Sequence, residues 1–238
     1  ATTYTEVKRE VMDFAGALCM LGLERGDRVA LLSEGCNKWV YSELGMLCAG
    51  GVNVPLSIKL TDGELVFRIQ HSRARFLLVS ANFLNRVKGI EGEIPDVEKI
   101  IVFNSMINEG RYLSFEKVQQ EGKEWLRTHQ AELDARIAAV GEHELVNISY
   151  TSGTTAEPKG IMLSHRNYVT NVLQADSLIQ IPDHYKVLLF LPWDHSFAHT
   201  VGLYSFMYNG ASVASVDYGQ SGMEYLRNIP VNLQEVKP

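Results

Sequence analysis

The hydrophobic positions of the chain alternate between two periods, and this alternation predicts the order of the elements. From Thr5 to Leu23 apolar residues recur every three or four positions, which indicates a helix with Thr3 or Thr5 as its N-cap. A short apolar run such as Arg28 to Ser33 is typical of a buried strand. The same criteria predict helices over 37–49, 61–71, 82–87, 166–180 and 196–208, and strands over 52–56, 76–80, 99–103, 145–150, 161–163, 186–191 and 211–216.

Strands that alternate with helices over the whole length predict an α/β fold of layered, largely parallel sheets flanked by helices. Residues 113–139 are charged and have a helical period, so we expect a solvent-exposed pair of surface helices there. No internal repeat or low-complexity linker interrupts the pattern. The sequence therefore offers no clean domain boundary within residues 1–238.

Composition and charge narrow the class of protein. The 238 residues are 46% apolar and 21% charged, which is ordinary for a chain with a substantial core. A net charge of −6 without any basic run argues against a nucleic-acid partner. Cys19, Cys36 and Cys48 lack the spacing of metal or redox motifs, and neither a membrane-span pattern nor a signal-peptide pattern is present. We therefore expect free thiols in a reducing compartment and a cytoplasmic location.

The stretch from Tyr150 to Gly160, YTSGTTAEPKG, has the residue types of a phosphate-binding loop. Gly153 allows backbone N–H groups to approach an anion, and Lys159 supplies a positive charge. Pro158 stiffens the approach to that lysine. Hydroxyl donors come from Ser152, Thr154 and Thr155.

Two alternatives compete for this loop. The P-loop pattern needs a glycine before its lysine and a hydroxyl residue after it, whereas Pro158 and Gly160 flank Lys159, so we reject that pattern. A polar hairpin loop without any ligand is the second alternative, and it is the common interpretation of an arbitrary run of such residues.

The order of the residues favours a ligand. YTSGTTAEPKG followed by IMLSHRNYV resembles the phosphate-binding signature of the adenylate-forming superfamily, which includes acyl-CoA synthetases, luciferases and peptide-synthetase adenylation domains. The chain departs from the family pattern at Ala156, where glycine is usual. A methyl group there would strain the loop wherever a positive φ is required.

A second segment, LPWDHSFAH from Leu191 to His199, resembles the LPxxHxFG segment of the same family. His195 matches the histidine that lies near the adenylated carboxylate in the family, and Phe197 matches the aromatic residue. A metal site shared by His195 and His199 is disfavoured, because the sequence shows neither the glutamate of a zinc protease nor a third ligand. Without the resemblance both histidines would be interpreted as core groups, and we keep that interpretation for His199.

The resemblance implies a two-step ligase. A carboxylate attacks the α-phosphate of ATP with Mg²⁺, which gives an acyl-adenylate and pyrophosphate, and coenzyme A then displaces AMP. Carried over by position, Lys159 and His195 are the candidate catalytic residues, and Thr151 matches a residue that touches magnesium in some members. The candidate nucleotide-binding residues are Thr151, Ser152, Gly153, Thr154, Thr155, Lys159 and Gly160.

Other stretches, TYTEV, GDRVALLSEG and GGVNVPLS, are most similar to the fatty-acid branch of the family. The resemblance makes residues 1–238 a partial N-terminal lobe, with the lid domain and its lysine absent and Tyr218 to Gly222 only a turn that is similar to the YGxTE motif. The final residues, NIPVNLQEVKP, resemble a segment that the family continues into a strand.

We therefore expect this part alone to be inactive and to self-associate. Peripheral membrane contact is expected only of the full-length protein. The alternatives that remain open are an amino-acid-activating adenylation domain and a non-catalytic nucleotide- or acyl-binding module.

Overall fold

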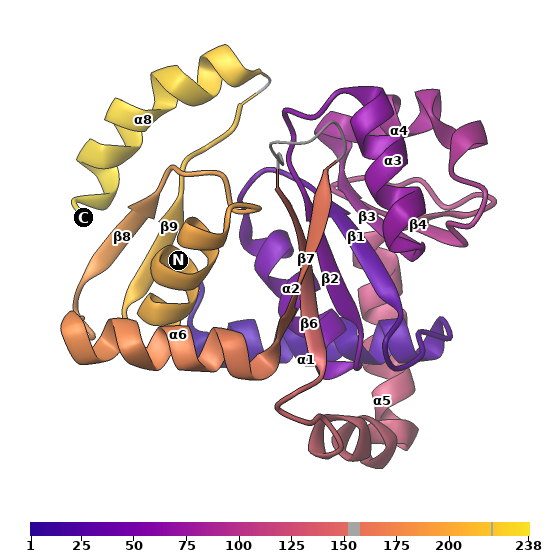
Figure 1. Ribbon diagram of the computed structural model, residues 1–238, viewed down its shortest axis with the longest axis horizontal. Helices are drawn as coiled ribbons and strands as arrows, with labels where there is room; N and C mark the ends of the chain where they lie inside the picture. Colours follow the sequence, from indigo (N-terminus) through magenta and orange to yellow (C-terminus); the bar gives the residue numbers. More distant parts are fainter. Residues whose placement is uncertain (152–157, 220) are drawn as a thin grey trace. The chain divides into compact units, whose positions relative to one another are not determined.

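The computed structural model describes residues 1–151, 158–219 and 221–238, and its elements follow an α/β order (Figure 1). The α-helices are α1 (Tyr4–Met20), α2 (Asn37–Cys48), α3 (Asp62–Ser72), α4 (Leu84–Gly89), α5 (Phe115–Ala138), α6 (His165–Leu178), α7 (Phe206–Tyr208) and α8 (Gly222–Val236). The strands are β1 (Arg28–Leu32), β2 (Val52–Leu56), β3 (Ala74–Ser80), β4 (Lys99–Phe103), β5 (Tyr112–Ser114), β6 (Leu145–Thr151), β7 (Lys159–Ser164), β8 (Lys186–Leu189) and β9 (Ser212–Ser215). Three further helical turns are η1 (Ala81–Phe83), η2 (Glu91–Glu93) and η3 (Ala198–Ser205).

The chain forms two compact units, residues 1–33 with 37–164 and residues 34–36 with 165–238. The first unit is built on a seven-stranded sheet in the order β5-β4-β3-β1-β2-β6-β7. Its strands are parallel except at the β6–β7 edge, where β7 runs antiparallel to β6. The predicted α/β class with a largely parallel sheet is thus confirmed. Helices α1, α2 and α5 pack against one another, and α3 lies across the opposite face of the sheet (Figure 1).

Side chains next to the helix starts fix where two of the helices begin. Thr3 accepts a hydrogen bond from the backbone N–H of Glu6, and the Glu6 carboxylate in turn accepts the Thr3 backbone N–H at 2.7 Å. That backbone hydrogen bond lowers the pKa of Glu6. Thr61 and Glu64 form the same reciprocal pair before α3. Of the two N-caps that the sequence allowed, Thr3 is therefore correct and Thr5 lies inside α1.

The charged segment 113–139 differs in part from its prediction. It begins with the short edge strand β5 and continues as α5, which consists of two helical segments joined by a kink at His129. One side of α5 packs into the core, where Phe115 stacks on Phe14 at 4.6 Å between ring centroids. The expected pair of helices is thus confirmed, but the expectation that it is solvent-exposed was wrong on one side, because a few buried residues spaced along a polar helix are enough to anchor it to α1.

The second unit contains a two-stranded parallel sheet, β8 with β9, together with α6, η3, α7 and α8. The predicted helix over 196–208 is confirmed, and its middle, η3, is a π-helix, a rare form that often occurs at functional sites. The final residues form helix α8 as far as Val236, with Pro230 inside it. Among the residues that the structure describes, no helix has both the length and the apolar character needed to cross a bilayer.

Candidate functional site

The candidate phosphate loop connects the two strands of the β6–β7 hairpin in the first unit. Five of the residues singled out in the sequence, Ser152, Gly153, Thr154, Thr155 and Ala156, lie outside the described residues. The flanking residues are described, and they correct one prediction. Lys159 is the first residue of β7 and Thr151 the last residue of β6, so both belong to strands rather than to the loop.

Thr151 and Lys159 are direct cross-strand partners in the hairpin. Directly opposed residues in an antiparallel pair project their side chains from the same face of the sheet, with Cβ atoms about 4.5–5.5 Å apart. Both residues are exposed. Within the described part of the chain, Lys159 makes no ion pair, so its charge is not neutralised there by a carboxylate. The hairpin therefore presents a hydroxyl and a cation side by side.

Gly160 lies opposite Tyr150, one pair further along the hairpin. A Cβ atom at Gly160 would lie 3.0 Å from Cγ2 of Ile148 and 3.4 Å from Cζ of Tyr150. Its φ is not positive, so it is space rather than backbone conformation that favours glycine here. The tyrosine ring fills that space.

Helix α3 supplies contacts to Tyr150 that sequence reasoning missed. The Tyr150 hydroxyl lies 2.8 Å from Nδ1 of His71, and Cζ of Arg68 lies 5.5 Å from the centroid of the tyrosine ring. Phe67 meets the same ring edge-on, with centroids 6.5 Å apart. These residues are separated from Tyr150 by about 80 positions, and nothing in the local pattern of α3 indicates the contact.

His195 belongs to the second unit, in the segment that follows β8. Its imidazole is exposed, and Nδ1 accepts a hydrogen bond from the backbone N–H of Phe197 at 3.3 Å. The neighbouring Trp193 is buried and donates from Nε1 to the Leu189 carbonyl at 3.5 Å. A Cβ atom at Gly35 would fall within 3.0 Å of the Trp193 ring, so glycine is needed where these two segments meet. Trp193, two residues before His195, thus contacts both β8 and Gly35, while the His195 imidazole itself stays accessible.

His199 has the opposite environment. It is only 2% exposed, and its ring lies 5.3 Å from that of Tyr168 and 4.9 Å from that of Tyr204. The interpretation of His199 as a core group is confirmed. Over residues 1–151, 158–219 and 221–238, no three His, Cys, Asp or Glu side chains gather in a way that could hold a metal ion.

Of the predicted turn from Tyr218 to Gly222, Gln220 lies outside the described residues, Gly219 lies in a turn after β9 as predicted, and Gly222 is the first residue of α8. Gly219 has a φ of +65°, and its backbone N–H donates to the Asp217 carboxylate at 3.0 Å. Ser221 then caps α8 by accepting the backbone N–H of Glu224 at 3.3 Å.

The described residues fit a magnesium–nucleotide complex better than a protein-held metal ion. Mg²⁺ commonly keeps several waters and takes its other oxygens from one or two protein groups and from substrate phosphates. Thr151 offers one exposed hydroxyl next to the Lys159 ammonium, which suits a phosphate-borne ion and would not hold a bare one.

Solved structures share this fold. An anthranilate CoA ligase in complex with anthranoyl-AMP aligns with a TM-score of 0.73 at 27% identity, over 88% of this chain and 39% of that one. An inhibitor-bound N-terminal domain of FACL13 from Mycobacterium tuberculosis aligns with a TM-score of 0.69 at 25% identity, over 90% of this chain and 50% of that one. The architecture is that of the N-terminal part of acyl-CoA ligases.

The family model named AMP-binding enzyme matches residues 1–232, and the chain belongs to this family. A relative in Rhodococcus jostii, an indenyl-propanoyl:CoA ligase, is 29% identical over 89% of this chain and 42% of its own length. A long-chain-fatty-acid–CoA ligase of Thermus thermophilus is 30% identical over 73% of this chain and 30% of its own. The chain thus spans less than half the length of these two relatives.

Proposed function

We propose that the chain is part of the N-terminal lobe of an adenylate-forming acid–CoA ligase. The full-length protein would join a carboxylate to the α-phosphate of ATP with release of pyrophosphate, and then transfer the acyl group to the thiol of coenzyme A with release of AMP. The observation that carries the proposal is the family match over residues 1–232, within which Thr151 and Lys159 are paired at the mouth of the phosphate loop.

The roles of the described residues follow from their placement. Nucleotidyl transfer depends on positioning and on neutralising charge, so groups that are fixed before the reaction contribute most. The Lys159 ammonium would offset the negative charge that develops on the departing pyrophosphate. The Thr151 hydroxyl, on the same face of the hairpin, would donate to a phosphate oxygen or complete the coordination of the accompanying magnesium.

A fatty acid is our proposed substrate class. The fatty-acid–CoA ligase of Thermus thermophilus and the resemblance of the N-terminal stretches to that branch support it. Relatives with other printed acids, the indenyl-propanoyl:CoA ligase and the anthranilate CoA ligase, make the acid the property to test first.

Pyrophosphate exchange by the full-length protein tests both proposals. We expect acid-dependent incorporation of labelled pyrophosphate into ATP, strongest with fatty acids in a panel that also contains aryl and amino acids. Strongest exchange with an aryl or amino acid would contradict the substrate class alone. No exchange with any acid would contradict the proposed function itself.

Replacing the two histidines should separate their roles. If His195 lines the carboxylate end of the acid site, His195→Ala is expected to raise the KM of the acid or slow adenylation, with stability nearly unchanged because the imidazole is exposed. His199→Ala removes a buried ring that contacts two tyrosine rings and is expected to lower the free energy of unfolding by about 2 kcal/mol.

Steady-state kinetics and urea unfolding measure the two effects. His184→Ala is a matched control, because that histidine is also exposed and lies in the second unit. The reverse pattern, with kinetics altered by His199→Ala and stability by His195→Ala, would exchange the two assignments.

A further inference from the structure

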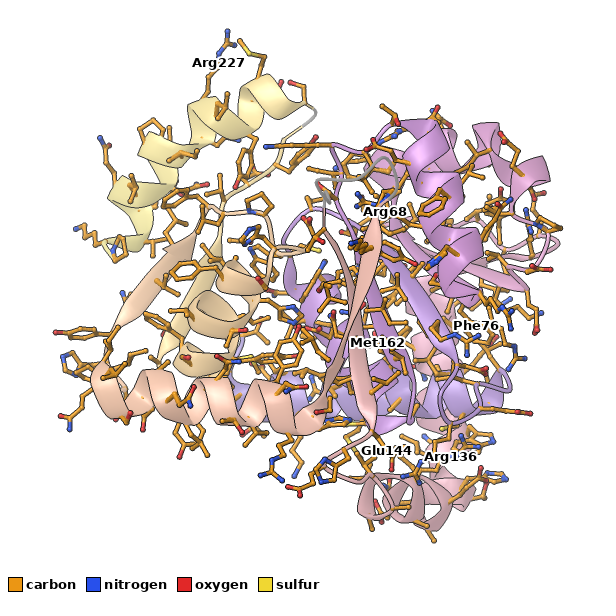
Figure 2. All side chains as sticks on the ribbon, viewed as in Figure 1. Arg68, Phe76, Arg136, Glu144, Met162 and Arg227 are labelled. Carbon is orange, nitrogen blue, oxygen red and sulfur yellow. The ribbon has the colours of Figure 1, made fainter. Side chains whose placement is uncertain are left out.

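Tyr150 joins helix α3 to the hairpin that carries the candidate phosphate loop. Its hydroxyl lies 2.8 Å from Nδ1 of His71 and 3.5 Å from the backbone oxygen of Arg68. The Arg68 side chain, which is only 8% exposed, places its guanidinium over the tyrosine ring at 5.5 Å. Figure 2 shows Arg68 beside the loop end of the hairpin, whereas Met162 lies further along β7. We call Phe67, Arg68, His71 and Tyr150 the α3 clamp.

Each contact in the α3 clamp restrains a different motion of the ring. The guanidinium over the ring face restrains movement perpendicular to the ring plane, and the hydrogen bond to His71 restrains rotation within it. Phe67 meets the ring edge-on, and the ring of His71 does the same at 5.7 Å between centroids. Burial raises the pKa of the Tyr150 phenol, against the opposing charge of Arg68, so the hydroxyl stays protonated at neutral pH.

The hairpin is shaped to receive this ring. The opposed residue across the hairpin is Gly160, and a Cβ atom there would lie 3.4 Å from Cζ of Tyr150 and 3.0 Å from Ile148. Glycine leaves the tyrosine room to lie over the cross-strand position. The clamp therefore fixes both strands of the hairpin at one pair of residues.

The next cross-strand pair is Thr151 with Lys159. Because successive side chains of a strand point to opposite faces, Tyr150 contacts α3 on one face while Thr151 and Lys159 project from the other. A movement of the Tyr150 peptide unit would therefore move the site pair directly.

We propose that Tyr150, held by Arg68 and His71 of α3, is a positioning residue that fixes Thr151 and Lys159 for contact with the nucleotide phosphates. This inference rests on the proposed ligase function of the hairpin. Tyr150 itself touches no substrate in this scheme, since its side chain lies on the α3 face.

Kinetics of the full-length protein provide the first test. Tyr150→Leu is expected to lower kcat/KM for MgATP in pyrophosphate exchange roughly 30-fold, because small misplacements of positioned groups are costly. Tyr150→Phe keeps the ring contacts and should lose only about fivefold, the value of one hydrogen bond. The loss of kcat/KM in the double variant Arg68→Met, Tyr150→Leu should be markedly smaller than the product of the two single losses. Each substitution removes the same contact, that of the guanidinium with the tyrosine ring.

Tyr112→Leu is the matched control. Tyr112 belongs to β5 at the other edge of the same sheet, lies under Lys88 Nζ at 5.7 Å and donates to the Glu91 carboxylate at 2.9 Å. The Tyr112→Leu substitution should lower the melting temperature about as much as Tyr150→Leu while leaving the KM of MgATP unchanged. Equal kinetic losses in the two variants would make Tyr150 a structural residue only and overturn the proposal.

Hydrogen exchange gives a readout that does not depend on activity. Without nucleotide, Tyr150→Leu is expected to speed amide exchange in the β6–β7 hairpin, and Tyr112→Leu to leave it unchanged. Unchanged hairpin exchange in Tyr150→Leu would overturn the positioning role even in an active enzyme. Absence of adenylation by the wild-type protein would instead overturn the proposed function, and the exchange result would still decide whether α3 fixes the hairpin.

Discussion

Lys159→Met is expected to slow adenylation by the full-length protein at least 10³-fold while leaving the fold intact. Preorganised charge at a reacting phosphate is worth about 10²- to 10³-fold per donor, and more where a full cation offsets transition-state charge. Lys159 is exposed, lies directly opposite Thr151 and forms no ion pair within the described part of the chain, so its removal leaves no other charge disturbed. The effect should appear in kcat for pyrophosphate exchange at saturating ATP and acid.

Lys186→Met is the control for net charge. Lys186 is also exposed and is also the first residue of a strand, β8. The Lys186→Met substitution should leave the rate of adenylation unchanged. Lys159→Arg should restore part of the rate, because the charge returns with a different donor geometry. A Lys159→Met variant with the wild-type kcat would remove this lysine from the mechanism.

Local signals in the sequence predicted the elements well, because most of them are decided within a few residues. Reciprocal capping by Thr61 and Glu64 sets the start of α3, and uninterrupted apolar runs such as Ile100 to Phe103 mark buried parallel strands. The sequence could not predict that α5 buries one side, since that depends on how closely α1 approaches it. It also could not predict the π-helical part of η3, which no local pattern encodes.

The candidate site shows the same division between local and distant information. The motif itself located Lys159 and Gly160, because glycine, hydroxyl and lysine residues lie within one short stretch, Ser152 to Gly160. The α3 clamp was missed, since Arg68 and His71 come into contact with Tyr150 only after β2, α3 and β6 have assembled. The pairing of Thr151 with Lys159 was likewise invisible until the hairpin register was known.

Gly122→Ala is expected to lower the free energy of unfolding by about 3 kcal/mol. A Cβ atom at Gly122 would fall within 3.0 Å of the Asp13 carbonyl oxygen and of the Ala17 backbone N and Cα in α1. These are backbone atoms that cannot rotate away, so α1 and α5 would have to separate, and overpacking typically costs about 1–3 kcal/mol or more. The intrinsic preference of alanine over glycine in a helix, up to about 1 kcal/mol, acts in the opposite direction and is outweighed.

Two further glycines make the test specific, with urea unfolding followed by circular dichroism as the measurement. Gly16→Ala would meet the Leu126 side chain, with Cγ at 2.6 Å, and the Gly122 backbone oxygen at 3.0 Å; because its closest contact is a side chain rather than backbone, a smaller loss of about 1 kcal/mol is expected. Gly89→Ala, at the end of α4, has no neighbouring atom within 4 Å and should be neutral or slightly stabilising. If Gly122→Ala proved as stable as Gly89→Ala, the close crossing of α1 and α5 would be refuted. The expected result is a loss of unfolding free energy that is largest at Gly122, smaller at Gly16 and absent at Gly89. That order would show that helix separation, rather than helix propensity, determines the cost of a methyl group at this crossing.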